Sequence, residues 1–423
     1  MDVLEDLSWR GLLYQTTDAE ALRQHLTTPR NVYAGFDPTR DSLTIGNLVA
    51  MLLLKRFQLA GHRPVVVMGG GTGMIGDPSG KEAERPILTR EQVDANVRNQ
   101  MRCFERVLDF SGENAASIVN NADWLEKLSY IDALRDIGKH FSVNMMIQKD
   151  SVRERLENRE QGISYTEFSY MLLQAYDFLH LFDEQNVTVQ AAGSDQWGNI
   201  VAGIDLIRRK RQATTFGLTA PLVTRADGSK FGKSESGNVW LSPEYTSPYA
   251  FYQFWLNTQD ADVVRYLKTF TLLPKAEIER LAGALEHDPG GRAAQRALAE
   301  HVTELVHGRE GLEQAVAATQ ALFSGDVANL SKATLDELFQ NAPTATLPRQ
   351  KLEGEGTVAV DLLVEAEVVK SKREAREFLG NGAIAFNGTT AALETRVTSS
   401  MLLHGEVLLV RRGRKNWHVL RFV

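Results

Sequence analysis

The chain has 423 residues, of which 43% are hydrophobic and 24% are charged, and its formal net charge is −7. These proportions are typical of folded globular proteins and exclude collagen-like and intrinsically disordered chains. The length predicts two or three domains, and no apolar run approaches the roughly 18 residues that a membrane-spanning helix needs, so we expect no membrane association.

The start of the chain predicts a cytoplasmic location. Asp2, Glu5 and Asp6 stand where a secretory signal would have basic residues, and a transit peptide would be rich in arginine and poor in acids. The single cysteine, Cys103, excludes a disulfide framework and a cysteine-based zinc site.

Roughly the first 225 residues alternate short apolar runs with longer helical patterns, which is typical of parallel strands joined by helices. Strands are predicted over 32–36, 64–68, 117–120, 187–191 and 217–223, and helices over 47–60, 91–108, 166–182 and 196–210. The predicted fold class is α/β, with a Rossmann-like doubly wound parallel sheet. Ligands of such a sheet bind at the carboxyl ends of the strands.

The first of these strands runs into a polar turn (residues 35–39), and the next helix starts at Thr44-Ile45-Gly46-Asn47. Free backbone N–H groups and the helix dipole at such a turn favour a phosphate group. Gly46 also lets a flat ring such as adenine approach the backbone closely. An ordinary capped turn would explain the same residues.

The run GTGMIG at 71–76 matches the dinucleotide pattern G-x-G-x-x-G directly after a strand. That pattern requires glycines that open a helix and an acid at the end of the next strand. Here turn-forming residues 77–80 follow the third glycine, and Glu91 and Asp94, the acids at the right distance, lie in a helical pattern. A Walker loop fails because Glu82 stands where serine or threonine is required. We therefore expect no dinucleotide cofactor.

Tyr170, Gln174 and Asp177 lie four and three residues apart, on one face of the predicted helix 166–182. Polar residues in such a row usually form a stripe on the exposed face of a helix. Because this row interrupts an otherwise apolar helix, we predict instead that it lines a polar cavity inside the domain.

The segment DGSKFGKS at 227–234 carries Lys230 and Lys233 among glycines and serines. Two lysines on such a loop can stabilise the charge that develops on a leaving pyrophosphate. A solvated hairpin tip is the alternative interpretation of the segment taken alone.

Residues from about 247 to 340 show helical periodicity, and the Pro/Thr-rich stretch 341–350 predicts a linker. A compact module follows, and residues 411–423 hold five lysines and arginines without an acid. A local basic patch can bind phosphates whatever the charge of the whole chain. A solvated basic tail explains the pattern equally well, and Trp417 can either stack on a base or belong to the core.

Taken together, these segments resemble the class I aminoacyl-tRNA synthetases, and within them the bacterial-type tyrosyl-tRNA synthetases. KFGKS at 230–234 is similar to the second signature of the family, and TIGN at 44–47 stands in place of the first, His-Ile-Gly-His. The resemblance runs from Trp9 to the C-terminus, and its most specific stretches are YAGFDPT at 33–39, GDPSGK at 76–81, GKHFSVN at 138–144, FSY at 168–170 and GSDQWGN at 193–199.

The resemblance implies a tyrosine–tRNA ligase that converts L-tyrosine and ATP to tyrosyl-adenylate and pyrophosphate, and transfers the tyrosyl group to the 3′ end of tRNA(Tyr). It implies a homodimer with Tyr165 near the interface, Mg²⁺ that arrives with ATP, and no protein-bound metal or organic cofactor. The implied domains are a catalytic domain over 1–245, a helical anticodon-arm domain over 246–340 and an S4-like RNA-binding domain over 351–423.

By the same resemblance, each site residue has an expected role. Tyrosine is expected to contact Tyr33, Asp77, Tyr170, Gln174, Asp177 and Gln190. The residues expected to act in catalysis are Thr39, Thr44, Asn47, Lys81, Lys230 and Lys233. ATP is expected to contact Gly35, Asp37, Gly46, Gly193, Asp195, Gln196, Leu222 and Val223. RNA is expected to contact Arg208, Arg209, Lys372, Arg373, Arg411, Arg412 and Lys415.

Three positions depart from the family pattern. Thr44 and Asn47 replace the two signature histidines, and Ala192 replaces a glycine. Thr44 and Ala192 motivate an alternative function, a catalytically degenerate synthetase paralogue that acts as an RNA-binding protein. A tryptophanyl-tRNA synthetase is a third interpretation, against which the phenol-binding pair Tyr33 and Asp177 argues.

Overall fold

The computed structural model of the chain describes residues 2–77, 88–149, 152–153, 156, 163–229, 231–234, 237–324, 327, 330–340, 342–413 and 416–423. The chain forms two compact units. The first contains residues 1–247 and 251–308, and the second contains 248–250 and 309–423. The predicted boundary at 245/246 does not coincide with this division.

A six-stranded sheet in the order β1-β6-β5-β2-β3-β4 forms the centre of the first unit. Its strands are β1 (Gln15–Thr16), β2 (Asn31–Phe36), β3 (Arg63–Met68), β4 (Ser117–Asn120), β5 (Val187–Gly193) and β6 (Phe216–Ala220). All neighbours pair in parallel except β1, which is an antiparallel edge strand on β6. The predicted last strand reached residue 223, but β6 ends at Ala220 because Pro221 has no N–H to donate.

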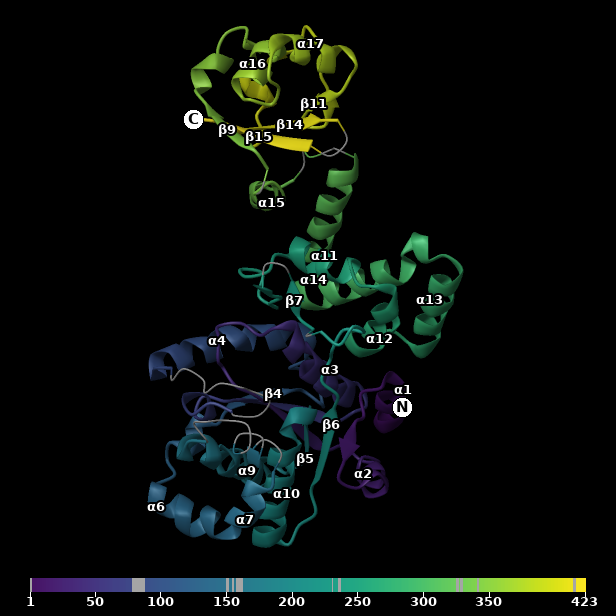
Figure 1. The fold of residues 1–423 in the computed structure, drawn as a ribbon. Coiled ribbons are helices and arrows are strands. Elements are labelled where there is room, and N and C mark those ends of the chain that lie inside the picture. The colour runs from purple at the N-terminus through teal and green to yellow at the C-terminus, as the bar shows by residue number, and fades with distance from the viewer. Residues whose placement is uncertain are drawn as a thin grey trace. The chain divides into compact units, whose positions relative to one another are not determined.

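Long helices cover both faces of this sheet. Figure 1 shows α3 (Ile45–Leu59) and α4 (Arg90–Val107) on one face, and α9 (Tyr165–Gln185) and α10 (Trp197–Arg211) on the other. The shorter elements of this part are α1 (Val3–Arg10), α2 (Ala19–His25), η1 (Thr72–Met74), α5 (Ala122–Leu125), α6 (Tyr130–Asp132), η2 (Ala133–Ile137), η3 (Gly138–His140), α7 (Val143–Ile147), η4 (Ser194–Gln196), β7 (Lys233–Ser234) and β8 (Gly237–Asn238).

Helices continue the chain after the sheet. They are α11 (Pro248–Leu256), α12 (Asp260–Phe270), α13 (Lys275–His287), η5 (Pro289–Gly291) and α14 (Ala293–Ser324). Gly308 interrupts α14 with φ 75° and ψ 177°, a conformation that a residue with a side chain rarely adopts. The two compact units divide at this residue.

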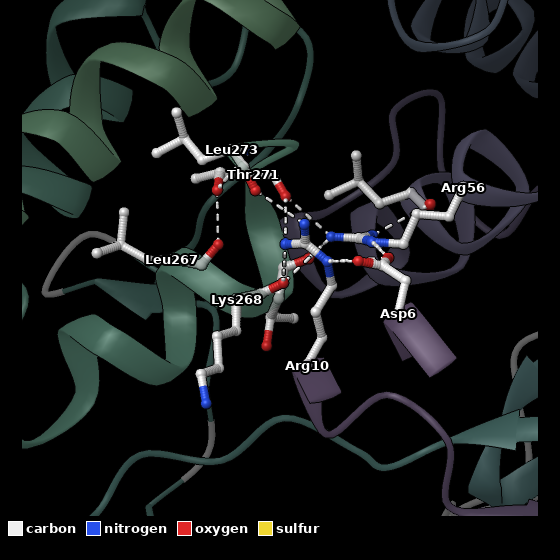
Figure 2. A network of polar contacts seen from close by, with 9 residues as sticks. Asp6, Arg10, Arg56, Leu267, Lys268, Thr271 and Leu273 are labelled. Atoms are coloured by element: carbon white, nitrogen blue, oxygen red, sulfur yellow. Dashed lines mark hydrogen bonds and ion pairs between the residues drawn. The ribbon is translucent and has the colours of Figure 1, made fainter. Parts of the chain in front are cut away.

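Two buried arginines connect α1 and α3 to the C-terminal end of α12 (Figure 2). Arg56 Nη2 donates to the carbonyl oxygens of Lys268, Thr269 and Thr271 at 2.9–3.2 Å. Arg10 donates to the carbonyl oxygens of Lys268 and Thr271 and, at 2.8 Å, to that of Leu273. Guanidinium groups satisfy the last carbonyls of a helix well, since its dipole is negative there.

Asp6 balances part of this buried charge. Its carboxylate accepts from Arg10 Nε at 2.9 Å and lies 3.7 Å from Arg56 Nε. Burial, with the neighbouring Arg10 as a second cause, lowers the pKa of Arg56 to about 9, although Asp6 opposes the shift. The cluster therefore fixes α3 and α12 relative to each other through charged hydrogen bonds.

The second unit contains a five-stranded sheet in the order β12-β11-β14-β15-β9. Its strands are β9 (Thr344–Leu347), β11 (Ile384–Phe386), β12 (Thr389–Thr390), β14 (Val407–Arg412) and β15 (Asn416–Phe422). The accompanying elements are α15 (Lys332–Leu338), η6 (Arg349–Leu352), α16 (Ala359–Glu365), α17 (Lys372–Gly380), η7 (Ser399–Met401) and the two-stranded pair of β10 (Thr357–Val358) and β13 (Arg396–Val397).

The prediction of a linker over 341–350 is wrong for residues 344–347. Residues 344–347 form β9, which pairs in parallel with β15 as the edge strand of the sheet. Pro343 and Pro348 flank this strand, a position that an edge tolerates because one side of the strand has no partner. Leu347 joins the core of the unit together with Leu408, Val410 and Leu420.

None of the helices in the described ranges is long and apolar enough to cross a membrane.

Candidate active site

The order of the strands creates a switch point between β2 and β5. The chain proceeds from β2 to β3 and β4 on one side, and then to β5 and β6 on the other. Loops that leave a parallel sheet in opposite directions create a crevice at the carboxyl ends of the strands. Gly35 is exposed although β2 is a central strand, and no described atom would lie within 4 Å of a Cβ there. Open space therefore begins above Gly35.

A phenol and a carboxylate are buried together at the inner end of this crevice. Tyr33 on β2 is 1% exposed, and Asp177 on α9 is 3% exposed. Burial raises the pKa of Tyr33 well above its usual value, and the carboxylate of Asp177 adds to the shift. The Tyr33 hydroxyl has no hydrogen-bond partner among the described residues. A buried hydroxyl in this state is available to a ligand.

Two donors hold the carboxylate of Asp177 in place. Asn121 Nδ2 donates to Oδ2 at 2.9 Å, and Trp124 Nε1 donates to Oδ1 at 2.7 Å. Burial raises the pKa of Asp177 to about 7, and the two hydrogen bonds limit the shift because they favour the ionised form. The group thus titrates near neutral pH.

We expect the affinity for a phenolic ligand to rise with pH up to about 8 and then level off. The ionised Asp177 accepts from a phenol better than the protonated acid does, so binding is linked to loss of a proton. With a pKa of about 7, the ionised fraction rises about tenfold between pH 6 and pH 8. Equilibrium dialysis of tyrosine without ATP measures the effect, and an affinity independent of pH over this range would contradict it.

Two of the other predicted tyrosine contacts, Tyr170 and Asp77, lie at the opposite end of a hydrogen-bonded row. Tyr170 donates to Asp37 Oδ2 at 2.9 Å, and Gln196 Nε2 donates to Asp77 Oδ2 at 2.7 Å. Gln174 is half-buried one turn from Tyr170 on α9. The structure therefore places two carboxylates, Asp37 and Asp77, at the end where a ligand's cation would be stabilised.

Gln190 on β5 lies beside Tyr33, with which it pairs in the sheet register. The side chain is 1% exposed, and its Oε1 has no hydrogen-bond partner among the described residues. Gln190 therefore has an acceptor free for a donor group in the crevice.

Sequence reasoning missed three residues that connect the two ends. Thr72 Oγ1 donates to Asp37 Oδ1 at 2.8 Å and accepts from Asn121 Nδ2 at 3.0 Å. Asn121 in turn binds Asp177, which Trp124 also binds. Asn121 and Trp124 directly follow β4, so the rule that ligands gather at the carboxyl ends of strands could have identified them.

The glycine run that imitates a dinucleotide motif serves close packing. Within the run, a Cβ on Gly71 would lie 2.9 Å from Leu125 Cδ1 and one on Gly73 would lie 2.9 Å from Pro38 Cδ; just before the run, a Cβ on Gly69 would lie 2.3 Å from Asp37 Oδ1. The following η1 is a single short 3₁₀ turn and not the long helix that a pyrophosphate needs. In the described residues, the glycines of this run therefore pack against neighbouring side chains and do not open a long helix.

At the first signature, residues 44–47, the observed contacts are those of an ordinary capped helix start. Thr44 donates through both its backbone N and its Oγ1 to Asn47 Oδ1, each at 3.0 Å. Gly46 is exposed beside them at the start of α3, and Thr39 is half-buried in the preceding turn. Of the predicted contacts near the carboxyl end of β5, Gly193 is the last residue of the strand and is half-buried, as is Gln196, whereas Asp195 is exposed. Beyond β6, Leu222 is 58% exposed and Val223 is half-buried.

The second signature lies against the first. Val239 N donates to Gly232 O at 3.0 Å, and Ile45 N donates to Val239 O at 3.1 Å. Phe231 packs on Phe254 and Trp255 of α11 and on Tyr266 and Phe270 of α12, with ring centroids 5.0–5.9 Å apart. Lys81 and Lys230 lie outside the described residues, and of Lys233 the structure describes only the backbone, in β7.

Several of the predicted RNA contacts have protein partners. Arg208 and Arg209 both pair with Asp205, at 2.5 and 2.7 Å, and Lys372 pairs with Asp361 at 2.7 Å. Arg373 is exposed, whereas Lys415 lies outside the described residues.

Near the end of the chain, aromatic contacts decide the role of Trp417. Arg411 lies over its ring, and the ring packs on Phe339 with centroids 5.1 Å apart. Arg412 Nη1 donates to Val368 O at 2.8 Å. The half-buried Trp417 is thus part of the packing of the unit, the alternative left open above.

Within the described part of the chain, no cluster of three or more histidine, cysteine, aspartate or glutamate side chains is arranged to hold a metal ion.

Comparisons with known proteins agree over nearly the whole chain. Residues 25–324 match the family model of tRNA synthetases class I (W and Y), and residues 335–420 match that of the Tyrosine–tRNA ligase SYY-like C-terminal domain. Tyrosine–tRNA ligase of Bacillus caldotenax is 53% identical over 426 residues, which cover 100% of both chains.

Two solved structures are also similar. A C-terminally truncated mitochondrial tyrosyl-tRNA synthetase of Coccidioides posadasii is 32% identical, with a TM-score of 0.65, over 75% of this chain and 91% of that one. The corresponding truncated enzyme of Aspergillus nidulans is 29% identical, with a TM-score of 0.68, over 76% of this chain and 94% of that one.

Proposed function

Because the chain belongs to the class I tRNA synthetases (W and Y), we propose that it activates L-tyrosine with ATP and transfers the tyrosyl group to the 3′ end of tRNA(Tyr). The observation that carries the proposal is the buried Tyr33 hydroxyl, which lacks a partner among the described residues and lies near the carboxylate of Asp177. The full-length similarity to tyrosine–tRNA ligases supports the same substrate.

Recognition of the para-hydroxyl follows from this pair. The ligand's phenol would donate to Asp177 and accept from Tyr33, which stays protonated because its pKa is raised. With phenylalanine bound, both groups would be buried without a partner, which costs about 1–3 kcal/mol for each. The ammonium group of the substrate would lie near Asp77, Tyr170, Gln174 and Gln190.

The activation step requires positioned reactants and stabilised charge. A carboxylate oxygen of tyrosine attacks the α-phosphorus of ATP, and the bond to the leaving pyrophosphate breaks in line with the attack. Lys81, Lys230 and Lys233, with Thr39 as a hydrogen-bond donor, would stabilise the charge that moves onto the pyrophosphate, and Mg²⁺ would arrive with ATP.

The nucleotide would lie over the turn before α3 and the loop after β5. Gly35 and Gly46 are exposed and leave room for the ribose and adenine, with Asp37, Gly193 and Gln196 around them. Asp195 would accept from the ribose hydroxyls, and Leu222 and Val223 would pack on the base. Thr44 and Asn47 would have to exchange their mutual hydrogen bond for contacts with ATP.

We propose that RNA contacts both units, at Arg208 and Arg209 in one and at Lys372, Arg373, Arg411, Arg412 and Lys415 in the other. The proposed domains remain catalytic over 1–245, anticodon-arm over 246–340 and S4-like over 351–423. β9 brings residues 344–347 into the last of these.

A homodimer is proposed from an exposed apolar surface in the first unit. It consists of Tyr130, Ile131, Leu134, Val143, Met145, Ile147 and Tyr165, each more than 40% exposed. Monomeric proteins seldom expose so many large apolar side chains together. Sedimentation at micromolar concentration should give twice the chain mass of 47.1 kDa, and a monomer would contradict the dimer.

The deciding experiment is ATP–pyrophosphate exchange with tyrosine, repeated with phenylalanine and tryptophan. We expect exchange with tyrosine and at least about a hundredfold less with phenylalanine, because two buried polar groups would lose their partner. Exchange with tryptophan alone would refute the proposed substrate. Absence of exchange with all three would favour the degenerate, RNA-binding paralogue that Thr44 and Ala192 motivate.

A further inference from the structure

A glutamine occupies a core position on α4. The buried side chains of this helix are Val93, Val97, Gln100, Phe104 and Val107, spaced alternately by four and three residues. Such a stripe is normally apolar throughout, since burying an amide costs free energy that its hydrogen bonds must offset. Gln100 is nevertheless 0% exposed.

The amide of Gln100 binds the backbone of the turn before α3. Its Nε2 donates to the carbonyl oxygen of Arg40 at 2.7 Å, whereas its Oε1 has no hydrogen-bond partner among the described residues. One turn earlier on α4, Asn96 Nδ2 donates to the carbonyl oxygen of Pro38 at 2.8 Å. Two amides four residues apart thus bind two carbonyls of one short segment.

A third side chain of α4 continues the row. Cys103 follows Gln100 by three residues, and its sulfur lies close to the backbone N–H of Leu43. Residues 96, 100 and 103 lie along one side of a helix. The row therefore follows the backbone of the turn from Pro38 to Leu43.

This turn carries Thr39, and its two ends belong to the candidate site. Asp37, at one end, accepts from Tyr170 and Thr72. Thr44, at the other end, begins the first signature. From its other side the turn touches the glycine loop, where a Cβ on Gly73 would lie 2.9 Å from Pro38 Cδ. Among the described contacts, α4 supplies the side-chain hydrogen bonds to the backbone carbonyls of Pro38 and Arg40, whereas Tyr245 donates to the carboxylate of Asp41.

We propose that Gln100 and Asn96 are positioning residues for amino-acid activation, which hold the turn of Pro38–Leu43 so that Thr39 meets the phosphates of ATP. The inference rests on the proposed function. Neither amide belongs to the tyrosine-binding row, so their loss should affect the step that involves ATP and spare the binding of tyrosine.

The substitution Gln100→Met distinguishes a positioning role of Gln100 from a role in packing alone. Gln100→Met fills a similar volume with an apolar side chain and removes a buried acceptor that lacks a partner. If Gln100 served packing only, this variant would be as stable and as active as the parent. If it positions the turn, stability stays or rises while activation falls.

The test measures three quantities in the full-length chain and its variants Gln100→Met and Asn96→Leu. We expect the kcat of tyrosine-dependent exchange to fall, or the KM for ATP to rise, by about tenfold in each variant, which is the effect of one lost hydrogen bond. The Kd for tyrosine should stay within about twofold. The melting temperature should not fall for Gln100→Met. Asn99→Leu, an exposed amide on the same helix, is the matched control and should behave like the parent.

Two results would overturn this inference and leave the proposed function intact. One is an active parent whose two variants exchange within twofold of it; the other is a loss of activity matched by equal losses of tyrosine affinity and melting temperature. If Gln100→Met does not fold, the same measurements on Asn96→Leu still test the inference, because Asn96 is only half-buried. A parent without tyrosine-dependent exchange would instead refute the proposed function, and this inference with it.

Discussion

Asp177→Asn is expected to lower kcat/KM for tyrosine about a hundredfold in ATP–pyrophosphate exchange. The phenol of the substrate would lose a charged acceptor, and a hydrogen bond to a charged group contributes about 1.5–3 kcal/mol. The new amide would also turn its NH₂ toward Asn121 Nδ2 or Trp124 Nε1, which are both donors. Exchange with phenylalanine should change much less, so discrimination between the two amino acids should narrow.

Asp183→Asn is the matched control. Asp183 lies on the same helix, but it forms an ion pair with Arg211 at the surface, where such a pair contributes little. The melting temperature of Asp177→Asn should change little, because relief from burying a charge offsets the donor that loses its partner. Wild-type kinetics in this variant would show that Asp177 does not contact the substrate.

Arg56→Ala is expected to destabilise the first unit by about 3–5 kcal/mol, the usual effect of removing one member of a buried charged cluster. The substitution leaves the carbonyl of Thr269 without its donor and opens a cavity between α3 and α12. The first calorimetric transition should shift down by roughly 5–10 °C.

Arg23→Ala provides the comparison, because Arg23 pairs with Asp2 and Glu20 at the surface with its side chain 51% exposed. Exposed pairs contribute about 0–1 kcal/mol, so this variant should melt close to the parent. Equal shifts for the two variants would mean that the buried cluster adds nothing to stability.

The long elements of the first unit were predictable because their periodicity is strong. Every predicted strand and helix of the parallel sheet exists within a few residues of its expected bounds. The edge strand β1 was missed because its two residues, Gln15 and Thr16, are too few to show an alternating pattern of apolar and polar side chains. β9 was mistaken for a linker because prolines flank it and its partner, β15, lies about seventy residues further on, so only long-range pairing defines it.

The site was predictable where one helix or one loop carries several polar residues. Tyr170, Gln174 and Asp177 stand out because they interrupt an apolar helix, and the resemblance to a family supplied their roles. Asn121, Trp124 and Thr72 were missed because each is an isolated polar residue whose partner lies on another element. Gln100 gave a signal that was overlooked, namely an amide at a core position of an amphipathic helix.

The backbone of the segment after β8 has a consequence for any dissection of this enzyme. Leu241 N donates to Leu43 O, and Ile45 N donates to Val239 O, so two regions that are distant in the chain are neighbours on one short ladder. A substitution in either region shifts atoms in both. The energetic effects of changes at the two signatures should therefore fail to add, and neither can be assigned a contribution of its own.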